Sequence, residues 1–434
     1  MYINMRQFPI LLIACMMAAM FVGCEQIGST DPQHDTTRLW PAYDWTADQW
    51  GYINHKGKMV IPAQFDEVNF FSCGYALVEK NDMYHYINTD GTIVYTIDER
   101  SKYDGEPFYY NYVVMKQGGR RYGLMNKNFE YVIQPTYANL REVADNGLLA
   151  MAQKVMLYSG DSVNVWGYLN TKGEQVIPAK YTYVRAFSDG FACVSDTKGW
   201  GVIDAKGKEV IPCQYPNILY VGGDMFVTIN KSFSAYTLMD AQGDELYTSD
   251  IRRFIPAVDN ELIGIVNNDG LHGYMDFDRN IRIACQYDYA MPFFEGYAFV
   301  EKEINDDYIT QVIDTKGQVL CTLPDDSEPE TGFHNGLALI VVDMGEAEAY
   351  RYITPKGEII YQWLEDEVPN CSPVRRLAER YSNTTHALTL TAEETSVDGD
   401  MQMSALEEFT EQTNHFSSRR LEQRRKHACD PSID

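Results

Sequence analysis

Large apolar residues alternate with small or polar ones over short stretches, and each stretch ends in turn residues. In "WGYLNTKGEQVIPAKY", residues 166–181, the opening "WGYLN" predicts a strand with one buried face. "NTKG" has the composition of a tight hairpin turn, in which Gly173 can adopt a positive φ. "EQVIP" predicts the return strand, and Pro178 is expected to end it because proline offers no N–H to the ladder.

A second half follows and predicts two further strands. "YTYVRAFSDGFACV", residues 181–194, reads as a strand, a turn at "SDG" and a partner strand. The same skeleton returns at 65–78 and 287–300, and a shorter form occupies 333–340. It consists of an aromatic residue, a Phe three residues before a Gly, and an Ala among apolar residues. Each unit therefore has three or four short strands and no room for a helix of ordinary length.

The first aromatic residue and the turn glycine locate nine units, at spacings of 34 to 44 residues. The longest step contains an insertion, residues 154–164, which we expect to form a protruding loop. The units begin near Trp50, Tyr84, Tyr122, Trp166, Trp200, Tyr236, His272, Thr310 and Tyr350.

One such unit cannot bury both faces of its sheet, so its stability must come from stacking on its neighbours. The expected fold class is all-β, a repeat array of three- to four-stranded antiparallel units, with a short helical or disordered C-terminal tail. The array is either an open superhelix or propeller-like. Units of this length are slightly short for four-stranded blades, and nine is an awkward number for one ring, which slightly favours the open array.

The repeated aromatic and glycine positions are interpreted as structural. The slot of Trp166 accepts Trp, Tyr, His and Thr in different units, as a packing position would; the alternative is a platform for stacking on sugars. The glycine beside it would allow close backbone approach. The positions assigned to repeat packing are Trp50, Gly51, Gly57, Tyr122, Gly123, Trp166, Gly167, Gly173, Trp200, Gly201 and Gly207.

These repeated segments resemble the WG-repeat family, also called KWG repeats. The resemblance covers about Trp50 to Trp363. It implies an all-β repeat architecture, usually of undefined biochemical role, and it supplies no catalytic residues.

The N-terminus has the pattern of a secretory signal. One positive charge, Arg6, precedes an apolar run over 8–22, and polar sequence follows from Glu25. Gly23-Cys24 at the boundary resembles the lipobox of bacterial lipoproteins, which implies that Cys24 is the lipid-attachment residue and the new N-terminus. Cleavage before Cys15 would leave an apolar run behind it, and an ordinary signal peptide remains the alternative.

Four regions follow from these patterns. They are a lipoprotein signal peptide (1–23), a polar tether (24–45), the β array (46–364) and a C-terminal tail (365–434). Within the tail, 404–427 has helix-forming composition and a basic cluster at Arg419, Arg420, Arg424, Arg425 and Lys426. That cluster is either a solvated end or a contact for acidic surface or envelope phosphate.

Composition and motifs nominate no reaction centre. The formal net charge of −26 argues against nucleic acid as a partner. The nine Cys form no CxxC pair, and Cys213 and Cys285 fill the slot of Ala63, as small buried apolar residues would. The eight His lack ligand spacing, and neither GxSxG nor a phosphate loop is present. We therefore assign no catalytic, cofactor-binding or metal-binding residue.

The expected function is that of a non-catalytic lipoprotein of the bacterial cell envelope. Lipidated Cys24 would hold it to a membrane, the outer membrane being expected, facing either the periplasm or the cell surface. The array would bind or scaffold an envelope protein or a glycan. Two alternatives are a secreted carbohydrate-active enzyme with carboxylates on the rim of the array, and a sensor or regulatory module.

Overall fold

The computed structural model describes residues 38–97, 106–118, 121–156, 162–230, 236–246, 250–258, 261–304, 307–345 and 347–366. The chain divides into two compact units, Met1–Asp31 and Pro32–Asp434, and all of these residues belong to the second. They form strands and turns, and they include no helix with the length and apolar character to cross a membrane. The expected signal peptide, Cys24 and the C-terminal tail lie outside them.

The strands form nine antiparallel sheets, here called blades 1 to 9 in chain order. Blade 1 contains β1 (Leu39–Asp44), β2 (Gln49–Asn54) and β3 (Met59–Phe65); blade 2 contains β4 (Glu67–Val68), β5 (Tyr75–Lys80), β6 (Met83–Asn88) and β7 (Ile93–Thr96); blade 3 contains β8 (Tyr112–Gln117), β9 (Arg121–Asn126) and β10 (Tyr131–Tyr137). Blade 4 contains β11 (Asn139–Val143), β12 (Leu148–Met156), β13 (Ser162–Asn170) and β14 (Gln175–Tyr181); blade 5 contains β15 (Tyr183–Val184), β16 (Phe191–Asp196), β17 (Gly199–Asp204) and β18 (Glu209–Tyr215); blade 6 contains β19 (Asn217–Gly222), β20 (Met225–Ile229) and β21 (Tyr236–Asp240). Blade 7 contains β22 (Ile251–Ile255), β23 (Ile263–Asn267), β24 (His272–Met275) and β25 (Ile281–Tyr287); blade 8 contains β26 (Tyr289–Ala290), β27 (Tyr297–Ile304), β28 (Asp307–Asp314) and β29 (Val319–Thr322); blade 9 contains β30 (Ser327–Pro329), β31 (Ala338–Asp343), β32 (Ala347–Ile353) and β33 (Ile359–Asp366).

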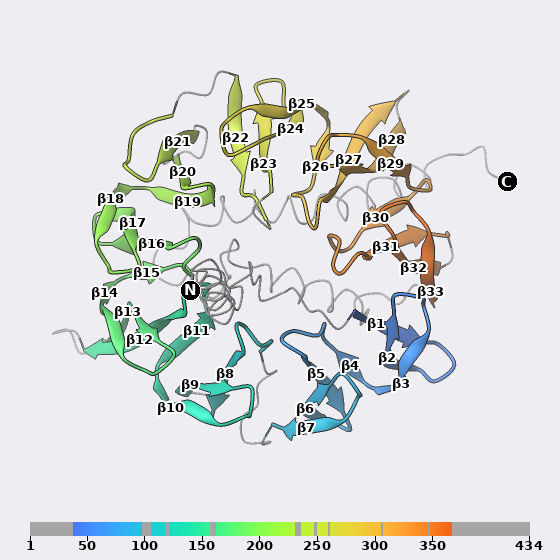
Figure 1. Ribbon diagram of the computed structural model, residues 1–434, viewed down its shortest axis with the longest axis horizontal. Coiled ribbons are helices and arrows are strands. Elements are labelled where there is room, and N and C mark those ends of the chain that lie inside the picture. Colours follow the sequence, from blue (N-terminus) through green and yellow to red (C-terminus); the bar gives the residue numbers. More distant parts are fainter. Residues whose placement is uncertain are drawn as a thin grey trace, which may run out of the picture. The chain divides into compact units, whose positions relative to one another are not determined.

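The blades follow one another around a ring, and blade 9 lies beside blade 1 (Figure 1). The fold is a nine-bladed β-propeller. This confirms the all-β array and its propeller-like alternative, and the slight preference for an open array was wrong. Each of the nine expected units supplies the third strand of one blade, beginning with β2. The first blade starts at β1, within the range assigned to the tether.

The sequence unit and the blade are out of phase. Tyr181 ends β14 in blade 4, and Tyr183 opens β15 in blade 5. The first half of a unit therefore gives the third and fourth strands of one blade, and its second half gives the first and second strands of the next. In Figure 1, first strands such as β15 lie toward the middle of the ring and fourth strands such as β18 lie outside.

Alternating strand direction gives the ring two rims. Turns between first and second strands, such as the one at Gly190, share a rim with turns between third and fourth strands, such as the one at Gly207. We call this edge the turn rim. Hairpins between second and third strands lie on the opposite edge, the hairpin rim. The chain enters blade 1 on the turn rim before β1 and leaves β33 on the hairpin rim.

The turn between third and fourth strands is fixed by its first residue. Asn170 Oδ1 accepts hydrogen bonds from the N–H of Lys172 and of Glu174, both at 3.0 Å, and Gly173 has a φ of +81°. Such an Asx turn favours Asn or Asp at the first position and a residue tolerant of positive φ at the fourth. The same arrangement recurs from Asn54 to Gly57 and from Asp204 to Gly207.

The glycine of the "WG" pair faces a bulge in the fourth strand. Trp166 pairs with Tyr181 and Tyr168 with Ile177, so the strand carries extra residues opposite Gly167. A Cβ on Gly167 would lie 2.5 Å from the Ile177 carbonyl oxygen, too close for any side chain. The expectation that Pro178 ends the strand was wrong, because it lies inside β14, in this bulge, where no ladder N–H is needed. Gly51, Gly123 and Gly201 face the same bulge in their own blades.

The turn glycine also contacts the preceding blade. A Cβ on Gly207 would lie 3.2 Å from the Ile177 side chain, and one on Gly173 would lie 3.4 Å from Ile133. The ring closes with a contact of the same kind, since a Cβ on Gly57 of blade 1 would lie 2.0 Å from the Ile360 carbonyl oxygen of blade 9. The turn glycine thus lies in close contact with the preceding blade, and at Gly57 the space excludes a side chain.

Among the described residues no strand is shared between blade 1 and blade 9, and side chains join the two blades. Blade 1 has no first strand among the described residues. Trp40, fully buried on β1, occupies a position that in the other blades holds a smaller residue: Ala76, Val113, Leu149, Ala192, Phe226, Ile263, Ala298 or Ala338. Its indole N–H donates to the His334 carbonyl of blade 9 at 2.9 Å. The large indole of Trp40 thus fills space beside the joint between blades 9 and 1.

Blade 3 has no glycine at this turn position, and a different pair of residues makes the contact with the preceding blade. Phe129, with a φ of +59°, occupies the turn position of the glycine, and Tyr95 in blade 2 occupies the position of the isoleucine. The two rings stack with centroids 4.8 Å apart and an interplanar angle of 3°. An aromatic pair here replaces the usual pair of isoleucine and glycine.

We expect Tyr95→Ile and Phe129→Gly to be coupled. Each single variant loses the stack, whereas the double variant restores the common pair and relieves the positive φ. The double variant should be more stable than the sum of the single effects by about 1 kcal/mol. Urea unfolding of the four proteins measures this. Pairing Phe129→Gly with Ile283→Val, in distant blade 7, is the additive control, and additivity in the Tyr95 cycle would contradict the account.

Candidate functional site

The tryptophans of the repeat lie in the seams between blades. Trp50 is 2% exposed and Trp166 is 5% exposed, while Trp200 and Tyr122 are half-buried. Trp50 belongs to the apolar cluster that joins blades 9, 1 and 2, and Trp166 belongs to the one that joins blades 4 and 5. None of these rings is presented flat to solvent as a platform for sugars would be.

The tyrosine that follows "WG" makes the most regular contact across a seam. The Tyr168 ring meets the Phe187 ring of the next blade edge-on, with centroids 4.7 Å apart, and the Tyr168 hydroxyl donates to the Arg185 carbonyl at 2.7 Å. Burial raises the pKa of Tyr168 well above its ordinary value, so the hydroxyl stays protonated and donates at any physiological pH.

Three further seams repeat this geometry. Tyr86 meets Phe108 at 5.4 Å and donates to Glu106 O at 2.7 Å. Tyr52 meets Phe71 at 4.8 Å and donates to Asn69 O at 2.8 Å. Tyr274 meets Phe293 at 4.6 Å and donates to Met291 O at 2.6 Å. The repeated Phe of the second half is evident in the sequence, but its pairing with the tyrosine of the first half is not, because the two lie in different strands and different blades.

Two arginines, also missed at the sequence level, clamp the tryptophans to the next blade. The guanidinium of Arg141 lies 4.7 Å from the Trp166 ring centroid and donates to Val184 O at 3.1 Å. Arg185 lies 4.5 Å from the Trp200 ring centroid and donates to Ile218 O of blade 6. Burial lowers the pKa of both side chains, but a guanidinium remains charged. Each cation joins a ring on its own blade to the backbone of the next.

The seam between blades 7 and 8 keeps the contact of Tyr274 with Phe293, but its tryptophan slot is polar. His272 fills the tryptophan slot, is buried, and lies 5.5 Å from the Tyr289 ring. Burial, with the charge of Glu301, raises the pKa of Tyr289, while Arg253 acts in the opposite direction. A histidine, a tyrosine and two opposite charges thus occupy a site where other blades place indole.

On the turn rim, carboxylates connect the turns between first and second strands of neighbouring blades. Asp145 Oδ2 accepts from the Asp189 N–H at 2.8 Å, and Glu295 accepts from the N–H groups of Asn335 and Gly336 at 2.7 and 2.8 Å. Burial raises the pKa of Asp145, and the hydrogen bond from Asp189 opposes that shift. These side chains are occupied in binding backbone, which is a structural role.

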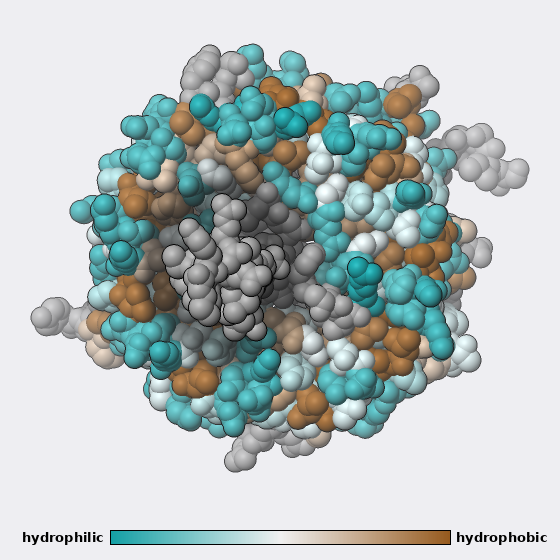
Figure 2. Space-filling model, viewed as in Figure 1, coloured by the Kyte–Doolittle hydropathy of each residue, from teal (hydrophilic) through white to brown (hydrophobic). Residues whose placement is uncertain are grey.

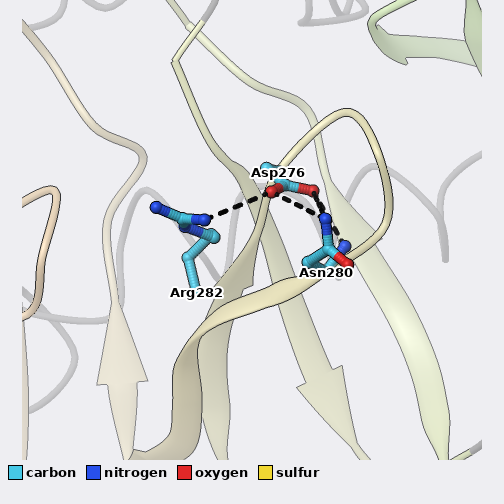
Figure 3. A network of polar contacts seen from close by, with 3 residues as sticks. All are labelled: Asp276, Asn280 and Arg282. Atoms are coloured by element: carbon cyan, nitrogen blue, oxygen red, sulfur yellow. Dashed lines mark hydrogen bonds and ion pairs between the residues drawn. The ribbon is translucent and has the colours of Figure 1, made fainter.

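The exposed turn of blade 7 contains a network of similar kind (Figure 3). Asn280 donates to Asp276 through its backbone N–H, at 2.8 Å, and through Nδ2, and Arg282 Nη1 lies 3.7 Å from Asp276 Oδ2. Burial would raise the pKa of Asp276, but the hydrogen bonds from Asn280 outweigh it and hold this pKa below its ordinary value. The carboxylate caps the turn and is not a candidate acid.

The described cysteines are free thiols. Cys213 is buried, and burial raises its pKa to about 11, which leaves very little thiolate at neutral pH. Cys285, the other cysteine in the alanine slot, is half-buried. Across the described ranges, no three His, Cys, Asp or Glu side chains gather in a way that would hold a metal ion.

Surface apolar residues are mostly scattered singly among polar ones, as the visible face in Figure 2 shows. One group stands apart, on the hairpin between β12 and β13. Val155, Met156 and Val163 are all exposed there, and Met156 is 69% exposed. The insertion expected at 154–164 therefore extends both strands of blade 4 onto the hairpin rim, with its tip outside the described residues.

We expect Tyr168→Phe to destabilise the propeller by about 1–3 kcal/mol, because the part-buried Arg185 carbonyl loses its hydrogen-bond donor while the ring contact remains. Urea unfolding measures the change. Tyr308→Phe, at an exposed hydroxyl on another hairpin, is the matched control and should change stability by less than about 0.5 kcal/mol. Equal effects of the two substitutions would contradict a special role for the seam hydroxyl.

Comparison with solved structures returns chains of distant sequence and low TM-score. The apo form of AztD from Citrobacter koseri has a TM-score of 0.33 and 13% identity, over 66% of this chain and 92% of that one. Kluyvelomyces marxianus Hsv2 has a TM-score of 0.31 and 11% identity, over 68% and 94%. The C-terminal WD40 domain of Sif2 has a TM-score of 0.34 and 10% identity, over 71% and 87%. Comparison with curated protein sequences gives no match.

Comparison with family models finds the WG containing repeat five times, over residues 50–84, 122–154, 166–196, 200–226 and 273–303. Every match begins at the third strand of one blade, on or beside its first aromatic residue, and runs into the next blade. In this chain, each matched stretch thus spans the seam between two blades. The chain belongs to the proteins built from WG-containing repeats.

Proposed function

We propose that this protein is a non-catalytic binding or scaffolding module of the bacterial cell envelope, which holds a protein or glycan partner on the hairpin rim of its propeller. The repeated residues are occupied in joining blades, so a partner must be bound by residues that the repeats do not share. The extended hairpin of β12 and β13 is the observation that carries this proposal.

This hairpin, which we call the arm, projects beyond its own sheet. The β11 ladder reaches only Ala152, and the β14 ladder reaches only Trp166. Beyond them, four residue pairs of β12 and β13, from Gln153↔Val165 to Met156↔Ser162, pair with each other and with no other strand in the described part of the chain. Both edges of the arm are therefore open to an added strand, a common mode of peptide recognition.

The side chains of the arm suit a protein partner. Val155 and Val163 form a cross-strand pair, and Met156 lies next to them. Exposed valine and methionine together form an apolar contact, and the flexible thioether of methionine adapts to different partner surfaces. Such a group is what distinguishes a binding surface from singly exposed apolar residues.

The place where the chain enters the ring is consistent with an envelope anchor. The first blade begins on the turn rim, and thirteen residues separate Cys24 from Arg38. A chain lipidated at Cys24 would be tethered from the turn rim, which leaves the arm directed away from the lipid. Two or three acyl chains would make that attachment stable.

Quantitative recovery of crosslinked partners from intact envelopes tests the binding role. We expect the triple variant Val155→Ser, Met156→Ser, Val163→Ser to lose at least about tenfold of a partner that the wild-type protein retains. The control variant Val60→Ser, Val176→Ser, Val319→Ser removes three exposed valines from outer strands and should retain it. Equal recovery with both variants would contradict binding through the arm.

The anchor is tested on the same material. Intact-mass measurement should find acyl chains on Cys24, and Cys24→Ser should release the protein from membranes. A soluble, unacylated wild-type protein would refute the anchor and leave the arm proposal standing.

A further inference from the structure

The closure of the ring between blades 9 and 1 continues onto the surface as an aromatic and acidic patch. We call Tyr43, Asp44, Trp45, Asp48 and Glu348 the seam patch. Trp45 is 52% exposed, and no other Trp, Tyr or Phe in the described part of the chain is as exposed. It lies in the hairpin between β1 and β2, on the hairpin rim.

The rings of this patch extend the buried closure outward. Trp50 and Trp363 meet edge-on in the closure, with centroids 5.9 Å apart. Tyr43 meets Trp50 at 5.3 Å on one side and Trp45 at 6.0 Å on the other. The exposed indole is therefore the last member of a series of packed rings, which holds it in place.

Three carboxylates lie around these rings. Asp48 accepts a hydrogen bond from the Tyr43 hydroxyl, and Glu348 accepts one from the Tyr350 hydroxyl at 2.8 Å. Asp44 Oδ1 accepts from the Thr46 N–H at 2.9 Å, which turns the hairpin. Aromatic faces together with carboxylates fit a cation, and a planar guanidinium fits best because it stacks and forms paired hydrogen bonds.

The protein already uses this chemistry twice. Arg141 stacks on Trp166 and Arg185 stacks on Trp200, each while donating to oxygen of the next blade. Both are internal and both join two blades. At the closure, the corresponding indole of Trp50 packs against Trp363, and the indole of Trp45 is 52% exposed.

The chain itself supplies guanidinium groups close to this place. β33 ends at Asp366 on the hairpin rim, and the Tyr361 hydroxyl of that strand donates to the Tyr43 carbonyl at 3.1 Å. The next basic residues are Arg375, Arg376 and Arg380, in "PVRRLAER". Eight residues separate Asp366 from Arg375, and an extended chain of that length spans up to about 30 Å. From Tyr361 to the end of β33 the strand covers about 17 Å, so the arginines are within reach of Trp45.

We propose that residues 374–380 of this chain dock on the seam patch, with an arginine stacked on Trp45 and the carboxylates of the patch binding the guanidinium groups. The segment then forms a strap from blade 9 to blade 1 across a closure that no shared strand secures. The basic cluster at 419–426 has the same charge, but a linker several times longer gives it a lower effective concentration at the patch. The strap is intramolecular, so it does not depend on the proposed function.

Photocrosslinking of the full-length protein tests the strap. A benzophenone amino acid replaces Trp45, the protein is irradiated, and mass spectrometry locates the crosslinks. Mixing isotopically heavy and light protein separates contacts within one chain from contacts between copies. We expect the main crosslinks to reach residues 374–380 of the same chain. The same probe at Tyr308, another exposed position on the hairpin rim, should not reach that segment.

A charge-reversal variant makes the test specific. Arg375→Glu, Arg376→Glu, Arg380→Glu should reduce the crosslink from position 45 at least about tenfold, and 0.5 M salt should weaken it, because the contact is between exposed charges. The matched control Arg419→Glu, Arg420→Glu, Arg424→Glu should leave it unchanged. Thermal unfolding confirms that each variant keeps its folded blades.

Several outcomes would contradict the strap. Crosslinks from position 45 mainly to 419–426, to a second copy, to a glycan or other partner, or to no part of the tail would each refute the strap. Persistence of the crosslink in the charge-reversal variant would refute its arginine chemistry.

Discussion

The ring depends on the contact that the residue after each "WG" pair makes with the next blade, which is a tyrosine at Tyr52 and Tyr168 and a valine, Val202, in blade 5. At Tyr168 the ring packs against Phe187 and the hydroxyl binds the Arg185 carbonyl, so a single side chain buries apolar area and satisfies backbone of the neighbour. A small sheet of three or four strands cannot bury both of its faces alone. The repeat therefore encodes the joint between two blades, and the blades follow from the joints.

The same view explains why the glycines of the repeat are placed where they are. Gly167 faces the bulge of its own fourth strand, and Gly207 lies against Ile177 of the preceding blade. Gly167 allows backbone to approach more closely than any Cβ would permit, whereas Gly207 supplies a positive φ and lies in tight contact with the Ile177 side chain. Where Phe129 replaces the turn glycine, Tyr95 replaces the facing isoleucine, so the constraint acts on the pair rather than on either residue.

Much of this architecture could be predicted from the sequence because it is written in local patterns. Alternation predicts the strands, and Asn170 with Gly173 predicts their turn. Local patterns do not show whether two strands joined by a short link belong to the same blade. Only Thr182 separates the last residue of β14 from the first residue of β15, so the pattern does not show that the blade changes there. Ring closure was beyond prediction for a related reason, since it depends on Trp40, Trp50 and Trp363, which lie at opposite ends of the array. The arginine clamps and the seam patch follow from such distant neighbours too.

The central claim is that nine joints close one ring, with the joint between blades 9 and 1 as close as any other. Lys56, Lys172, Lys206 and Lys356 precede the turn glycines of blades 1, 4, 5 and 9 and occupy the same place in each turn. Spin labels attached without cysteine chemistry, because the described chain holds free thiols, allow the distance between two turns to be measured in solution. The account predicts that the distance between labels at 56 and 356 equals that between labels at 172 and 206, because both pairs lie on neighbouring blades. A distance between 56 and 356 that is far longer, or too broad to define, would show an open array and contradict the account.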